Sequence, residues 1–408
     1  MLRRHRADAL MVIFMAILMV IGLVVIYSIS PALTARINAA GNTLDQNHFM
    51  YRQVAYLFAG VAAFSVATFV PLDWWRKHRL KLLIVAVGLS LVPVLFATTD
   101  VALCTNGACR WINLGFVTLQ PAEALKFALV IFVAAFLGNR AEQQKLQNVK
   151  ETLIPLGILL GVLAVIVVGL QKDLGTGLAL FGIVVSVLYV AGLDRKYFAM
   201  SLGVIGAAGL LFVLASPHRL ERIATFMNAG DNKDSTGYHI NQALIAIGSG
   251  GWFGKGLGRS VQAFGYLPEA ANDSIFAIVA EKFGFVGTVV ILIIFAFLFL
   301  RLLRVMDQAG TVYHRLLMAG IFGWVFTHAI VNIGAMLGIF PLTGVTLPFL
   351  SFGGTSLLFI MLALGVAFQI SRYTTHQKNP TDEEGGAYED RRSRRGLGRA
   401  RYAGSSRY

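Results

Sequence analysis

Ten long apolar runs divide this sequence, and they constrain its fold more than any other feature. A helix needs roughly 20 apolar residues to cross a bilayer core of about 30 Å. Only 14% of the residues are charged, whereas about a quarter are charged in soluble domains. We therefore predict an all-α polytopic membrane protein with ten transmembrane helices. The runs lie at about 10–30, 52–70, 80–97, 120–138, 152–170, 174–192, 197–215, 274–300, 314–339 and 354–371.

Basic residues predict the orientation of these helices. If the N-terminus is cytoplasmic, the short cytoplasmic segments hold 15 Lys and Arg residues and the short outside loops hold four. Membrane proteins carry such an excess in their cytoplasmic loops. Both termini are therefore predicted to be cytoplasmic, with residues 1–9 preceding a membrane domain at 10–371. Residues 216–273 are expected to form a large extracytoplasmic loop between helices 7 and 8.

The C-terminal tail, residues 372–408, is rich in Arg, Gly, Ser and Tyr. Such a composition predicts disorder. The net charge of +14 suggests nucleic acid at first, but basic clusters beside membrane helices usually meet anionic lipid headgroups. We expect membrane lipids, and no nucleic acid, as partners of this tail.

The stretch 248–285 combines a glycine-dense loop with the start of an apolar helix, and Asp273 stands at the transition. On a helix, Glu281 would face within roughly 80° of Asp273. Carboxylates at or within a membrane helix are costly and usually functional. We predict that Asp273 carries out chemistry at the membrane surface, with Glu281 as a second carboxylate deeper in.

Three more ionisable residues lie in or beside the spans. Glu123 and Lys126 are three residues apart on one helix face, as a self-neutralising pair or as the lining of a polar cavity. Asp173 follows a short turn, where it is expected to cap the sixth helix more than to act in catalysis. The only cysteines, Cys104 and Cys109, are predicted to form a disulfide in an outside loop.

Arginines at the outer membrane face suit the geometry of phosphate groups. Taken singly, each is better explained as an interfacial side chain. If four of them converge on one vestibule, they fit a lipid pyrophosphate. The four are Arg52, Arg110, Arg219 and Arg222.

Prolines and glycines interrupt the apolar sequence GIFPLTGVTLPFLSFGGTSLL near the outer face. Non-helical backbone at membrane depth persists only where protein or a water-filled cavity covers it. Ser351 and Ser356 are candidate hydrogen-bonding groups for a substrate in such a cavity.

Several motifs resemble the SEDS family (shape, elongation, division and sporulation), and within it the FtsW branch more than RodA. They are QPAEALK, QKDLGTG, PHRLERIATF, GYHINQALIAIGSGGWFGKGLG, YLPEAANDSIFAIVAEKFG and GIFPLTGVTLPFLSFGGTSLL. Members polymerise lipid II into peptidoglycan at the outer face of the bacterial cytoplasmic membrane, with a class B penicillin-binding protein. The resemblance implies this glycosyltransferase activity, divisome partners and a role in septal synthesis.

The resemblance also assigns residues. The essential acid of the family falls on Asp273, within the motif that contains Glu269, and the paired charges of the fourth span fall on Glu123 and Lys126. Four positions depart from the family pattern: Asn272, Ser274, Lys282 and His328. The resemblance leaves room for a divalent ion, Mg²⁺ or Mn²⁺, with Asp273 among its candidate ligands.

These observations give one mechanism and two alternatives. Asp273 acts as the general base for the acceptor hydroxyl, and the four arginines hold the leaving pyrophosphate. Alternatively the protein is a lipid II flippase in which Glu123, Lys126 and Asp173 act in gating. A weaker alternative is a scaffold that only recruits partners.

Overall fold

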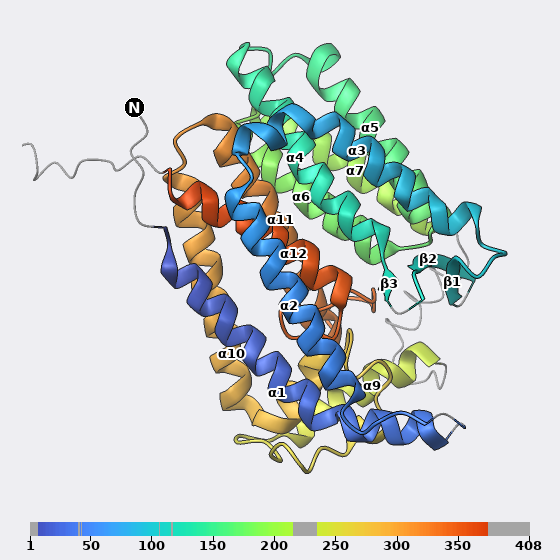
Figure 1. The fold of residues 1–408 in the computed structure, drawn as a ribbon. Coiled ribbons are helices and arrows are strands. Elements are labelled where there is room, and N and C mark those ends of the chain that lie inside the picture. The colour runs from blue at the N-terminus through green and yellow to red at the C-terminus, as the bar shows by residue number, and fades with distance from the viewer. Residues whose placement is uncertain are drawn as a thin grey trace, which may run out of the picture.

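A computed structural model describes residues 7–39, 41, 43–105, 107–115, 117–214 and 235–373. These residues are mostly helical (Figure 1). Two short π-helical segments, η1 and η2, flank α5, and one 3₁₀ turn, η3, precedes α10. The bounds are α1 Ala9–Ala39, α2 His48–Phe69, α3 Leu72–Leu95, α4 Pro121–Glu142, η1 Val149–Leu153, α5 Ile154–Ala164, η2 Val165–Leu170, α6 Leu174–Ala191, α7 Arg195–Leu214, α9 Ser235–Ser249, η3 Gln262–Phe264, α10 Ile275–Asp307, α11 Val312–Met336 and α12 Gly354–Ser371.

The predicted spans coincide with these helices. Within the described residues, nine helical segments are long and apolar enough to cross a membrane, with η1, α5 and η2 counted as one. The remaining predicted span, 197–215, overlaps α7. The all-α polytopic fold is therefore confirmed, and the described helix ends lie within a few residues of most predicted ones.

The first and last membrane helices begin and end on the same side of the protein. The backbone N–H of Asp8 donates to Ser371 Oγ at 3.1 Å, and the Asp8 carboxylate accepts from Arg301 at the far end of α10. An Arg–carboxylate pair of this kind is charge-assisted and directional. Together these bonds hold the start of α1 next to the ends of α10 and α12. This arrangement agrees with an even number of spans.

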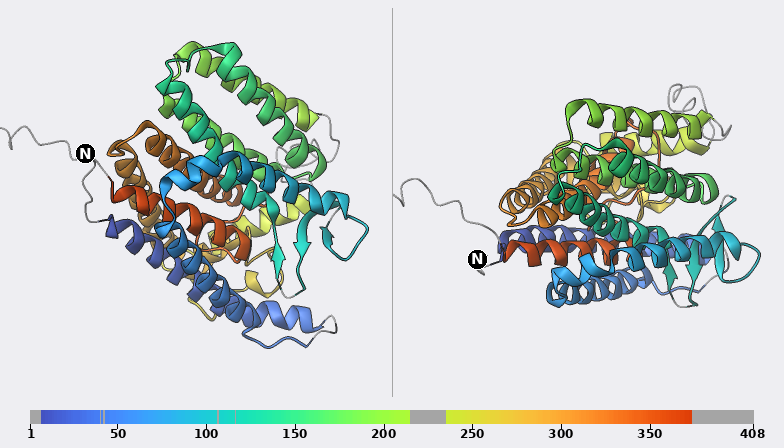
Figure 2. Two further views of the ribbon diagram at one scale, coloured as in Figure 1. Left: turned by 45° about the horizontal axis from the view of Figure 1, so that its top comes forward. Right: turned by 90° about the horizontal axis from the view of Figure 1, so that it is seen from above.

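Small residues allow the central helices to approach closely. A Cβ added at Gly182 on α6 would collide with Thr327 on α11, and one at Gly323 on α11 would collide with Ser186. Membrane helices pack through small residues because lipid offers no hydrophobic drive between them. Figure 2 shows α5, α6 and α7 on the side of the molecule opposite α1 and α2, with α4, α11 and α12 between them.

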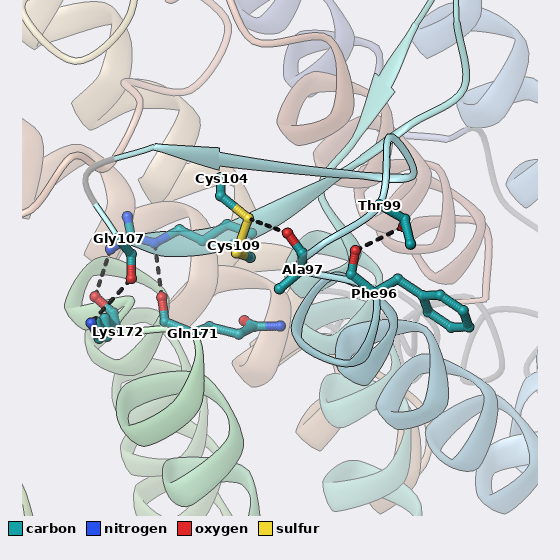
Figure 3. Close-up of a disulfide and its surroundings, with 9 residues drawn as sticks. Phe96, Ala97, Thr99, Cys104, Gly107, Cys109, Gln171 and Lys172 are labelled. Atoms are coloured by element: carbon teal, nitrogen blue, oxygen red, sulfur yellow. Dashed lines mark hydrogen bonds between the residues drawn. A yellow bond between two sulfur atoms is a disulfide. The ribbon is translucent and has the colours of Figure 1, made fainter.

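A small antiparallel sheet, which the sequence did not predict, lies between α3 and α4. Its strands are β1 Ala102–Thr105, β2 Ala108–Asn113 and β3 Thr118–Leu119, in the order β1-β2-β3. Cys104 and Cys109 face each other in the register and form a disulfide (Figure 3). The hairpin is also tied to the turn before α6, because Lys172 Nζ donates to the Gly107 carbonyl at 3.0 Å.

The helix α10 differs from the predicted span. It runs over 33 residues, with a break at Gly284, where φ is 68°. Residues 275–282, before the break, are all buried in protein. The exposed large apolar side chains of α10 begin after the break, at Phe285.

Candidate active site

The described residues enclose a cavity of about 440 Å³ where several helices and loops meet. Its walls come from α2, the β2–β3 hairpin, α4, the start of α6, the loop before α10, α11 and the loop before α12. Most of the polar residues expected from the sequence share this one space. Among the lining residues are Arg52, Tyr56, Arg110, Trp111, Gln120, Glu123, Lys126, Asp173, Thr176, Glu269, Asn272, Asp273, His328, Thr346 and Ser356.

Asp273 lies on the cavity wall, two residues before α10 begins. Burial, and to a lesser degree the negative charge of Glu269, raise the pKa of its carboxyl to about 7. The Asn272 side-chain amide donates to Glu269 Oε2 at 2.5 Å and so holds the Glu269 carboxylate beside Asn272. A carboxyl with this pKa is a stronger base than an ordinary Asp, which has a pKa near 3.9.

The backbone at Asp273 is fixed from α11. Asn332 Nδ2 donates to the Asp273 carbonyl at 2.6 Å and to the Val345 carbonyl at 2.7 Å. Ser274 is the N-cap of α10 but makes no side-chain capping bond. Its hydroxyl donates instead to the Pro268 carbonyl at 2.8 Å and lies 2.6 Å from His239 Nε2.

Glu123 and Lys126 form a buried ion pair at the cavity wall, 2.8 Å apart. Lys126 Nζ also lies 2.9 Å from His328 Nε2, and Trp324 Nε1 donates to the same nitrogen at 3.2 Å. The indole N–H is only a donor, so Nε2 carries no proton and the imidazole is neutral, with its proton on Nδ1. The single lone pair of Nε2 is shared by these two donors, and His328 links the Lys126 ammonium of α4 to α11.

Asp173 caps α6. Its Oδ1 accepts from the Thr176 backbone N–H at 2.9 Å, and its Oδ2 accepts from the Thr176 hydroxyl at 2.9 Å. Gln120 Nε2 also donates to Oδ2, at 3.3 Å. Both oxygens are engaged within the protein, although Asp173 lines the cavity. The arrangement favours a structural role at the helix N-terminus.

Two of the four predicted arginines lie on the cavity, and the other two, Arg219 and Arg222, lie outside the described residues. Arg110 Nε and Nη2 donate to the carbonyls of Gln171 and Lys172, at 3.0 and 2.6 Å. Arg52 lies over the ring of Tyr56, with its guanidinium carbon 5.8 Å from the ring centre. Both cations therefore face the space that Asp273 faces.

Two predicted residues do not reach the cavity. Ser351 Oγ accepts from the Leu347 backbone N–H at 2.8 Å and closes a turn. Glu281 is fully buried and accepts from Ser260 Oγ, from the Val261 N–H and from Lys255 Nζ. The expectation that Glu281 stands behind Asp273 is corrected here: α10 starts after Asp273, so helical spacing does not relate the two. Ser356, in contrast, lines the cavity.

The model of the FtsW/RodA/SpoVE family of cell cycle proteins matches residues 8–376 of this chain. The chain belongs to this family. Among its relatives, Stage V sporulation protein E of Bacillus subtilis is 36% identical over 92% of this chain and 99% of that protein. A probable peptidoglycan glycosyltransferase FtsW of Coxiella burnetii is 35% identical over 90% of this chain and 96% of that protein.

The same fold occurs in solved structures. The rod shape determining protein RodA of Thermus thermophilus aligns with a TM-score of 0.62 at 25% identity, over 90% of this chain and 98% of that one. A chain of a peptidoglycan synthase complex, described for its structural coordination of polymerization and crosslinking, aligns with a TM-score of 0.69 at 24% identity, over 90% of this chain and 98% of that one. This FtsW/RodA/SpoVE protein is therefore a multi-pass protein of the bacterial cytoplasmic membrane.

Several residues of the site in this FtsW/RodA/SpoVE protein were not predicted from the sequence. Asn332 holds the backbone of Asp273, and Trp111, Tyr56 and Gln120 line the cavity. A signal for Asn332 is present, since it lies in a stretch without Lys, Arg, Asp or Glu from Leu316 to Ser371. An isolated polar side chain in such a span is costly unless it finds a partner.

Proposed function

We propose that this protein polymerises lipid II into glycan strands at the outer face of the cytoplasmic membrane, for septal wall synthesis in cell division. Peptidoglycan glycosyl transfer is the activity that the names of its FtsW relatives state. The single observation that carries the assignment to a site is one cavity lined by Asp273, Arg52 and Arg110 together. An acid that can act as a base and two cations are what this transfer requires.

The reaction joins the 4-hydroxyl of an acceptor sugar to C1 of a donor. The new C–O bond forms as the bond from C1 to the undecaprenyl pyrophosphate breaks, and the hydroxyl proton must leave. Asp273 takes this proton. A general base works best when its pKa is near the working pH, and the pKa of Asp273 is raised to about 7.

The leaving pyrophosphate needs positive charge close to its oxygens as negative charge develops. Arg52 and Arg110 supply it from the cavity wall. Arg110 Nε and Nη2 donate to backbone carbonyls, so we assign contact with the pyrophosphate to its Nη1 group. We assign Arg219 and Arg222 the same task as part of this proposal, and Ser356 and Glu269 contact the sugars.

A divalent ion receives no step in this mechanism. Within the described ranges, no group of three or more His, Cys, Asp or Glu residues is arranged to hold a metal ion. Asp273 and Glu269 are the two cavity carboxylates of the loop before α10, and two carboxylates from the protein are few for Mg²⁺ or Mn²⁺ unless substrate phosphates complete the coordination.

The partner is proposed to be a class B penicillin-binding protein with other divisome proteins. One solved chain of the same fold belongs to a peptidoglycan synthase complex that coordinates polymerization and crosslinking. A polymerase of this kind produces the strands that such a transpeptidase joins.

Purified protein in detergent, incubated with lipid II with and without the partner, tests the function. Glycan chains that disappear in Asp273→Asn but persist in Asp100→Asn support the polymerase. The Asp100 side chain is exposed in an outer loop and does not line the cavity. Transport of lipid II across vesicles without any polymer would instead favour the flippase.

A further inference from the structure

The segment 250–266 turns large apolar side chains outward. Trp252 is 68% exposed, Phe253 is 83% exposed and Phe264 is 64% exposed. Val261 and Tyr266 are about half exposed, whereas Ala263 and Leu267 between and beside them are buried. Three aromatic rings this exposed within a short segment are not ordinary surface residues of a protein in water.

The opposite side of this segment is fixed to α10 through polar groups. Lys255 N–H and Gly256 N–H donate to the carbonyls of Glu281 and Lys282, at 2.9 and 3.0 Å. The buried Glu281 carboxylate accepts from Ser260 Oγ at 2.5 Å and from the Val261 N–H at 2.9 Å. These bonds leave the segment no freedom to rotate its apolar face inward.

Further bonds attach the segment across the break in α10. Phe285 N–H donates to the Gly251 carbonyl at 2.8 Å, and Val286 N–H donates to the Trp252 carbonyl at 3.1 Å. Lys282 Nζ donates to the Leu257 carbonyl at 2.6 Å. The outward face is therefore held at a defined height along α10. The segment runs along the lower edge of the molecule in Figure 1, below α10.

The exposed apolar surface of α10 begins at that height. Beyond Gly284, exposed apolar residues recur along one face: Phe285, Val286, Val290, Ile293, Phe297 and Leu300. Residues 285–307 extend over about 35 Å at 1.5 Å per residue, which suffices for a hydrocarbon core of about 30 Å. The Trp252 ring packs edge to face on Phe285, with centroids 5.3 Å apart.

We propose that residues 250–266 form an interfacial anchor, seated in the headgroup region of the outer leaflet. The apolar face of the segment continues the lipid-facing surface of α10 without a gap at Trp252 and Phe285. Tryptophan and other aromatic residues concentrate at this level of membranes. Arg259, exposed in the same segment, adds attraction to anionic phospholipids.

The anchor sets the height of the catalytic carboxylate. The chain passes from Phe264 through the buried Leu267 to Asp273, so an anchored segment fixes Asp273 relative to the lipid surface from which a lipid-linked sugar projects. This consequence rests on the proposed function. The depth of the segment in the bilayer does not, and it is measured without any turnover.

Nitroxide labels on single cysteines of the full chain in phospholipid nanodiscs test the anchor. The two native cysteines are joined in a disulfide, so Phe253→Cys and Phe264→Cys give single labelled sites. Asp45→Cys, exposed in an outer loop, is the aqueous reference, and Phe297→Cys within the α10 span is the lipid reference. The readout is relaxation by oxygen, which partitions into lipid, against a water-soluble nickel chelate.

At both loop positions, the ratio of oxygen to nickel accessibility is expected to be several-fold above that at Asp45 and below that at Phe297. In nanodiscs with anionic lipid, Arg259→Gln is expected to lower that ratio. A ratio equal to that at Asp45 would overturn the anchor, since the segment would then lie in water. Protection from both reagents would overturn it as well, because a protein partner or a second copy would then cover the face.

Discussion

Asn332 holds Asp273 by its main chain. The Asn332 side-chain amide, from α11, donates to the Asp273 carbonyl at 2.6 Å and to the Val345 carbonyl at 2.7 Å. One buried group therefore joins the loop before α10 to the loop before α12, and both loops line the cavity. The position of the carboxylate depends on this bond, although Asn332 does not line the cavity itself.

Replacing Asn332 with Leu is expected to slow polymerisation by misplacing Asp273. The change keeps the approximate size but leaves two buried carbonyls without a donor, at a cost of about 1–3 kcal/mol each. We expect kcat to fall by roughly tenfold or more, since 1.4 kcal/mol corresponds to about a factor of ten, with a smaller change in KM. Ile330→Ala, at a half-exposed position on the same helix, is the control. A lower melting temperature with kcat intact would show that Asn332 is only structural.

The rate is expected to rise with pH around pH 7. Asp273 acts as a base only when ionised, and its pKa is raised to about 7 by burial and by the charge of Glu269. Glu269→Gln removes the neighbouring charge, so the pKa of Asp273 falls and the midpoint of the kcat/KM profile moves to lower pH. Asp100→Asn leaves the midpoint in place. A Glu269→Gln midpoint at or above the wild-type value would contradict the assignment.

The membrane helices could be predicted from the sequence because each apolar run carries its signal locally. The pairing of Glu123 with Lys126 could be predicted in the same way, because residues three positions apart on a helix lie on the same face. The segments between helices carried less information. The β1–β2 hairpin consists of strands of four and six residues in a polar loop, which is too short for a clear alternating pattern.

Contacts between distant segments could not be predicted from the sequence. Asn332 is 59 positions from Asp273, and the partners of Glu281 are in a glycine-rich loop about 20 residues earlier. The prediction that Asp273 and Glu281 lie on neighbouring faces of one helix is wrong, because it requires α10 to include Asp273, and α10 begins at Ile275. A helix start is uncertain by one or two residues when it is inferred from sequence, and here that difference decides whether helical spacing relates Glu281 to Asp273, which lines the cavity.

Breaking the buried ion pair is expected to cost more stability than removing it entirely. Lys126→Met leaves the buried Glu123 charge without its cation, and breaking such pairs costs about 3–5 kcal/mol. The double variant Glu123→Gln/Lys126→Met removes both charges and should recover most of the loss. Thermal unfolding in detergent measures this.

The exposed pair Lys145–Glu151, at 2.8 Å, provides the matched control for the buried pair. Surface pairs contribute about 0–1 kcal/mol, so Lys145→Met should leave the melting temperature almost unchanged. If Lys126→Met is as stable as the double variant, the loss of the Lys126 cation does not destabilise the protein through Glu123, which would contradict the prediction.

The disulfide hairpin is expected to govern substrate affinity through Arg110. Cys104–Cys109 closes the turn of the hairpin (Figure 3). The strand β2 carries Arg110, which lines the cavity. A cross-link over so short a loop contributes about 2 kcal/mol in the chain-entropy account. Without it the hairpin loosens, and we expect a higher KM for lipid II with a smaller effect on kcat.

Dithiothreitol should reproduce this rise in KM in the wild-type protein and have no effect on Cys104→Ser/Cys109→Ser, which is its own control. Lys172→Met, which removes the bond from Nζ to the Gly107 carbonyl, should raise KM in the same direction. Both changes act on the hairpin that carries Arg110, so their effects on KM should be less than additive. An unchanged KM after reduction would mean that the Arg110 bonds to Gln171 and Lys172 alone position the guanidinium.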